Sequence, residues 1–103
     1  MMTTGCNSSR TEIKQYQAIE IILMNHPKLM DYLFAKAKPE LKCSAEILLK
    51  NARGYSSSEQ ILIKIALDFW NATGHVYLNE ILESLDTDNF IKVVKGIIHL
   101  KTQ

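Results

Sequence analysis

One stretch decides the fold of this chain: GYSSSEQILIKIALDFWN, from Gly54 to Asn71. It opens with Ser56 and Glu59 at the spacing of a capping box, in which each side chain binds the backbone N–H of the other residue at a helix N-terminus. The later polar residues form one narrow stripe at spacings of four, four and three: Gln60, Lys64, Asp68 and Asn71. A helix that is apolar on its other sides must be covered by neighbouring helices. The stretch therefore predicts a central buried helix over about residues 58–72.

Length and composition indicate one folded domain. The chain has 103 residues, of which 47% are hydrophobic and 22% are charged, values typical of a globular protein rather than a disordered one. The first residues lack the charged and apolar segments of a signal peptide, and no apolar run is long enough to span a bilayer. Cys6 and Cys43 form no CxxC pair. We therefore expect a cytoplasmic protein without membrane contact, with a flexible tail over residues 1–8 and a single domain over residues 9–103.

Helix signals also precede the central stretch. Ser9 and Glu12 have the spacing of a second capping box, which predicts a helix over residues 9–25. Pro27 and Pro39 then predict the first turns of two further helices, over residues 27–37 and 39–53. Proline suits a first turn because its φ is already helical and because the N–H that it lacks would have no partner there.

The same reasoning applies after the central helix. Gly54 and Gly74 occupy positions where glycines commonly end helices in the left-handed conformation. Apolar spacing predicts a short helix over 78–85, and Asp86 is a good N-cap for a final helix over 87–100. The predicted fold class is thus all-α, a compact bundle of five or six short helices.

The final helix is more apolar than one surface helix requires. Seven of its fourteen residues are apolar: Phe90, Ile91, Val93, Val94, Ile97, Ile98 and Leu100. Either this helix packs deep beside the central one, or part of its face is left for a partner, most simply in a symmetric dimer. Gly96 lies inside this helix at a cost in helix propensity. It is either tolerated near a fraying end or required where another helix, such as that of a second subunit, approaches closely.

No pattern predicts catalysis, a cofactor or a metal. The three serines at residues 56–58 are interpreted as helix-capping residues. The sequence has no strand-turn-helix pattern that would present one of them as a nucleophile. The three histidines are scattered, so no metal-ligand spacing exists. Aromatic residues near the end of the central helix are expected in the core. A small-molecule pocket, if one forms, would lie near Asp68, Trp70, His75 and Tyr77.

We therefore expect a small non-enzymatic module for protein–protein interaction or regulation, acting through a helical surface and able to form a homodimer. Four acids are the predicted specificity element, because they would steer a basic partner: Glu80, Glu83, Asp86 and Asp88. Gly96 and Ile98 are the expected contact residues on the final helix.

Nucleic-acid binding is the alternative, since the order of helices over residues 78–100 resembles that of a helix-turn-helix. The net charge is only +1, and the segment from Leu78 to Ile91 holds four acids and no base, a surface that repels phosphate. A basic face elsewhere supports the alternative, although Glu40 and Glu46 interrupt it: Lys36, Lys38, Lys42, Lys50 and Arg53.

Overall fold

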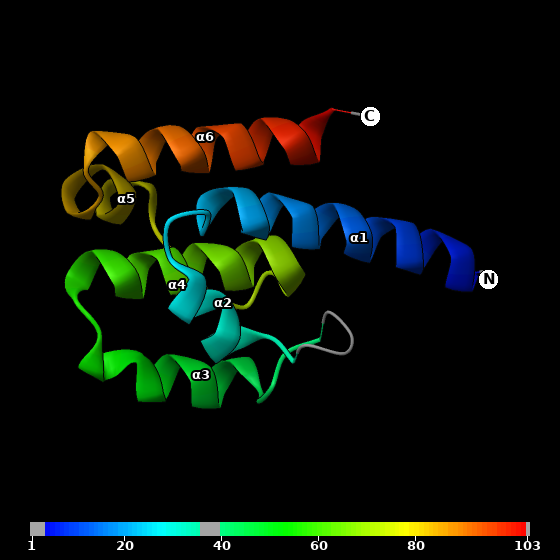
Figure 1. The fold of residues 1–103 in the computed structure, drawn as a ribbon, viewed down its shortest axis with the longest axis horizontal. Coiled ribbons are helices and arrows are strands. Elements are labelled where there is room, and N and C mark those ends of the chain that lie inside the picture. Colours follow the sequence, from blue (N-terminus) through cyan, green and yellow to red (C-terminus); the bar gives the residue numbers. More distant parts are fainter. Residues whose placement is uncertain (1–3, 36–39, 103) are drawn as a thin grey trace.

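The structure, a computed structural model, describes residues 4–35 and 40–102, with side chains from residue 13 onward. In this part of the chain, six α-helices and one 3₁₀ turn are joined by short links, which confirms the predicted all-α bundle (Figure 1). The elements are α1 (Thr4–Ile22), α2 (Pro27–Leu33), α3 (Ala45–Asn51), η1 (Ala52–Gly54), α4 (Ser57–Asn71), α5 (Leu78–Ser84) and α6 (Thr87–Lys101).

The centre of the bundle is α4, as predicted. Its capping box is formed: the Ser56 hydroxyl accepts from the Glu59 N–H, and the Glu59 carboxylate accepts from the Ser56 N–H. Six of its residues are buried, on several sides of the helix: Ile61, Leu62, Ile63, Ile65, Ala66 and Leu67. Helices α1, α2, α3 and α5 all pack on α4.

The outermost helix is α6, which packs mainly on α1 (Figure 1). In that view α1 lies between α6 and α4, and α3 forms the opposite side of the molecule. One side of α6 is thus covered by α1 of its own chain.

Aromatic rings connect three elements of the core. Phe34 is buried, and its ring lies edge-on to Tyr16 and to Trp70, with ring centroids 5.1 Å apart in both pairs. Such T-shaped pairs are favourable because the positive edge of one ring meets the negative face of the other. Trp70 therefore packs against the core, as its position late in the central helix predicts.

Four predicted boundaries before α4 are wrong: both ends of the first helix, the end of the second and the start of the third. The first helix begins at Thr4 and ends at Ile22, so the Ser9–Glu12 pattern lies inside it. A capping motif allows a helix to start at that point but does not require it to start there. A helix that continues through the motif keeps its regular backbone hydrogen bonds. The second helix stops at Leu33 because Phe34 is extended. The Ala35 N–H donates to the carbonyl of Glu40, and the Lys42 N–H donates to that of Leu33.

The third helix begins at Ala45 rather than at Pro39, which lies outside the described residues. Ser44 is its N-cap and accepts a hydrogen bond from the Ile47 N–H. The Lys42 N–H binds the carbonyl of Leu33 at the end of α2, and this pairing keeps the segment before Ser44 out of the helix.

The predicted left-handed glycines are also wrong. No glycine in the described ranges has a positive φ, and the left-handed residues are Ala72, with φ 61°, and His75, with φ 54°. Gly74 is needed for a different reason, since a Cβ there would lie 1.8 Å from the carbonyl oxygen of Lys64. The link after α4 folds back so tightly against the helix that no side chain fits.

Candidate interaction surface

One side of α6 is used to hold the fold together. Val93 and Gly96 are buried, and a Cβ on Gly96 would lie 2.9 Å from both Ile22 Cγ2 and Phe69 Cε2. Close approach of another helix is therefore the reason for this glycine. The approaching helix is α1 of the same chain, so Gly96 offers no surface to a partner.

Two polar contacts fix the rotation of α6. Near its C-terminus, His99 Nε2 lies 3.0 Å from Gln17 Oε1 on α1. Near its N-terminus, His26 Nε2 lies 3.1 Å from Asn89 Oδ1. These contacts hold both ends of the helix with Val93 and Gly96 turned inward.

The other side of α6 carries large apolar side chains in solvent. Their exposed fractions run from 37% to 54%, and we name them the α6 stripe: Ile91, Val94, Ile97 and Ile98. Ile91, Val94 and Ile98 are spaced three and four residues apart, so they share one helix face. A single chain therefore does not bury the whole apolar face of its last helix. Of this stripe, only Ile98 was predicted as a contact residue. The number of apolar residues predicted that this helix has more apolar surface than its own fold requires. It did not show on which side of the helix that surface lies.

Charged residues follow the α6 stripe on a neighbouring face. Asp88, Lys92 and Lys95 are spaced four and three residues apart. Asp86 is the N-cap and accepts from the Asn89 N–H at 2.9 Å, while Lys101 lies in the last turn. The helix is thus acidic at its start and basic toward its end.

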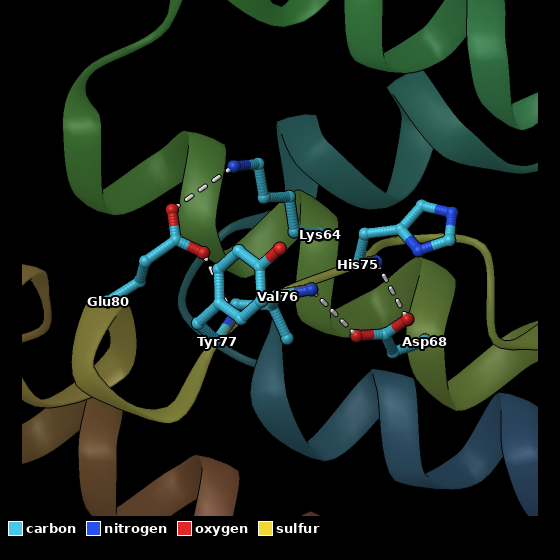
Figure 2. A network of polar contacts seen from close by, with 6 residues as sticks. All are labelled: Lys64, Asp68, His75, Val76, Tyr77 and Glu80. Carbon is cyan, nitrogen blue, oxygen red and sulfur yellow. Dashed lines mark hydrogen bonds and ion pairs between the residues drawn. The ribbon is translucent and has the colours of Figure 1, made fainter.

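The four predicted acids have different surroundings. Glu80 belongs to the polar network of Figure 2, where it accepts from the Tyr77 N–H at 2.9 Å and pairs with Lys64 Nζ at 3.3 Å. The Tyr77 hydrogen bond and the neighbouring ammonium hold the pKa of Glu80 below its ordinary value. Asp86 caps α6. Glu83 and Asp88 are exposed and remain open to a partner.

The same network closes the link after α4. Asp68 Oδ1 accepts from the His75 N–H at 3.0 Å, and Oδ2 accepts from that of Val76 at 3.1 Å (Figure 2). Oδ1 also accepts from the Gly74 N–H at 2.8 Å. Asp68 is thus an anchor for this turn, a role that the sequence did not reveal. Of the residues of the expected pocket, Asp68 meets His75 through the backbone N–H of the histidine. Trp70 packs on Phe34, and Tyr77 is 70% exposed.

The predicted basic face is only partly described. Lys42, Lys50 and Arg53 are exposed, whereas Lys36 and Lys38 lie outside the described residues. Lys50 lies in the last turn of α3 and Glu46 in its first turn, where each complements the helix dipole. The described part of this face therefore carries both signs of charge.

Among the described side chains, no three of His, Cys, Asp and Glu lie together as metal ligands. Within the same ranges, no helix combines the length and the apolar character that crossing a membrane requires. Comparison of the chain with protein-family models, with curated proteins and with solved structures found no match.

Proposed function

We propose that this chain is a small non-enzymatic interaction module that self-associates through the α6 stripe. The observation that carries the proposal is the exposure of four large apolar side chains on one helix whose other side is locked onto α1. Apolar surface gathered in this way is typical of a protein–protein contact.

The charges along α6 favour a second copy in antiparallel orientation. A two-fold axis near Val94 would place Ile91 of each copy beside Ile98 of the other. It would also bring the acidic start of one helix toward the basic end of the other, so that Asp88 approaches Lys101 of the second copy. The antiparallel helix dipoles add to this attraction. A two-fold contact must be self-complementary, and this pattern of apolar and charged residues satisfies that requirement.

The size of the contact predicts a weak dimer. A helix of 15 residues is about 22 Å long. One such pair buries less than the ~1,600 Å² of a standard stable interface. We therefore expect a monomer–dimer equilibrium that depends on protein concentration.

Light scattering after size exclusion, over a wide range of concentration, tests the proposal. The apparent mass should rise toward twice the monomer mass as concentration increases. Val94→Lys should abolish this rise, because two like charges would meet near the axis. Ile47→Lys is the matched control, since it adds the same charge at an exposed apolar position on α3. A monomer at every concentration, or equal loss in both variants, would overturn the proposal.

A charge exchange tests the antiparallel arrangement. Asp88→Lys alone and Lys101→Glu alone should each weaken the dimer, and the loss should diminish in high salt. The double variant should recover most of the affinity, because the pair is restored with its signs reversed. If the double variant loses as much dimer affinity as the two single variants lose together, the two residues do not face each other.

Nucleic-acid binding has less support. The exposed basic side chains of Lys42, Lys50 and Arg53 share their face with the negatively charged Glu46. A fluorescence titration with short duplexes and single strands at low salt examines it. Salt-sensitive binding that is lost in Lys50→Glu with Arg53→Glu would assign the basic face to nucleic acid. Absence of such binding would end this alternative.

A further inference from the structure

A second surface feature lies away from α6, between the last turns of α1 and the helix α2. It is an open groove of about 320 Å³, and no residue of α6 lines it. This volume is at the lower end of the range for ligand pockets. The groove therefore suits one or two side chains of a partner rather than a large free ligand.

The apolar lining of the groove has a rigid part and an adaptable part. Leu23 is buried and forms the floor. The ring of Tyr16 is held edge-on against Phe34. Met24, Pro27 and Met30 complete the apolar lining, and Met24 is 64% exposed. Thioether side chains can adjust to differently shaped partners, and methionine is common on surfaces that bind peptides.

The polar groups of the groove are all acidic or neutral. Glu20 and Asp31 are its charged residues, both exposed, and no Lys or Arg lines it. Among the described side chains, neither carboxylate has an ion-pair partner. Burial, followed by the charges of Glu20 and Asp31, raises the pKa of Tyr16, so both carboxylates act on the ring that lines the groove.

The nearest lysine in the sequence does not line the groove. Lys28 follows Pro27 on α2 and is exposed. The groove thus keeps its negative character beside an apolar lining.

We infer that this groove binds a basic and apolar segment of a protein partner, with one arginine between Glu20 and Asp31 and a neighbouring aliphatic side chain on Leu23. A guanidinium can pair with a carboxylate through two parallel hydrogen bonds and also stack on an aromatic ring. Its aliphatic stem would lie along Met24 and Met30. This binding does not depend on α6, and it holds whether or not the chain forms a dimer.

A titration of the full chain, labelled with ¹³C in the methionine methyl groups, tests the inference. The probe is an acetylated and amidated Gly-Leu-Arg-Leu-Gly peptide. The methyl signals of Met24 and Met30 should shift in a saturable way. The same peptide with citrulline in place of arginine keeps the shape but not the charge, and it should bind at least about fivefold more weakly. A chain that shows no saturable shift with the arginine peptide would overturn the inference.

Variants of the protein complete the test. The double variant Glu20→Gln with Asp31→Asn should bind the arginine peptide at least about fivefold more weakly. Glu46→Gln, at an exposed carboxylate on α3, should leave its affinity unchanged. Equal affinity of the arginine and citrulline peptides, or equal binding by the double variant and the unchanged chain, would show that Glu20 and Asp31 do not recognise the cation.

Discussion

Gly96 and Phe69 lie so close together that a Cβ on the glycine would be 2.9 Å from Cε2 of the ring. Ile22 of α1 meets the same position at the same distance. This contact lets α6 lie flat on α1 while reaching the end of α4. It also determines which side of α6 faces inward and which side carries the α6 stripe.

Gly96→Ala should therefore destabilise the protein, although alanine is the better helix former. Alanine gains at most about 1 kcal/mol in helix propensity, whereas overpacking costs about 1–3 kcal/mol. The backbone oxygen of Ala18, at 3.2 Å, cannot move aside as a side chain can. We expect the free energy of unfolding in urea to fall by about 1 kcal/mol. Gly54→Ala is the control, because nothing lies within 4 Å of its added carbon. A Gly96→Ala variant as stable as the parent would contradict the close approach.

Asp68→Ala should loosen the link between α4 and α5. Three backbone N–H groups lose their acceptor, and we expect a loss of about 1.5–3 kcal/mol, the range for a hydrogen bond to a charged group. Asp68→Asn should lose less, since the amide oxygen still accepts. Hydrogen exchange at Gly74, His75 and Val76 should become faster in the alanine variant. Unchanged exchange at these three amides would show that Asp68 does not anchor the turn.

Lys64→Gln should leave the urea midpoint nearly unchanged. The pair that it forms with Glu80 is at 3.3 Å, but both side chains are about one-third exposed, and exposed ion pairs contribute only about 0–1 kcal/mol. Glu80→Ala should do more, because it also removes the acceptor of the Tyr77 N–H. Exchange of the Tyr77 amide separates the two variants: it should speed up only in Glu80→Ala.

Glu59 should contribute stability that depends on pH. Hydrogen bonds from the Ser56 backbone and side chain lower the pKa of Glu59 from its ordinary 4.5. The ionised form is therefore favoured in the folded state, and its contribution is present above about pH 4.5 and lost as pH falls through the lower folded value. Unfolding curves of the parent and Glu59→Gln should differ near neutral pH and converge in acid. Glu83→Gln, on the exposed side of α5, is the control. A difference that does not change with pH would contradict the capping interaction of the carboxylate.

Tyr16 should titrate above its ordinary pKa of 10.0, chiefly because it is partly buried and then because Glu20 and Asp31 lie nearby. Its neutral form is favoured in the folded state, so the stability it contributes is lost as pH rises from 10 through the folded pKa. Replacing Glu20 and Asp31 with Gln and Asn should lower the pKa of Tyr16 toward 10. Titration of ¹³Cζ-labelled tyrosines by NMR measures this directly, with Tyr16→Phe to assign the signal. No response to the double change would place the carboxylates away from the groove.

Several elements follow from local sequence alone. The Ser56–Glu59 box, the Asp86 cap and the narrow polar stripe of α4 each depend on residues within a few positions of one another. Their hydrogen bonds and helix periodicity do not require knowledge of the rest of the fold, and the structure contains all three. The central position of α4 follows as well, because a helix that is apolar on most sides must be surrounded.

Only the tertiary structure decided the other features. Phe34 leaves α2 to pack between Tyr16 and Trp70, and the segment after it pairs back on the end of α2, so α3 begins only at Ala45, after its N-cap Ser44. Position 96 needs a glycine because Ile22, 74 residues earlier in the chain, lies against it. No local pattern in the sequence reveals this contact. The surplus apolar surface of the last helix was visible in its composition. Its location on the α6 stripe depends on how α6 is rotated against α1, and that rotation comes from packing between residues far apart in sequence.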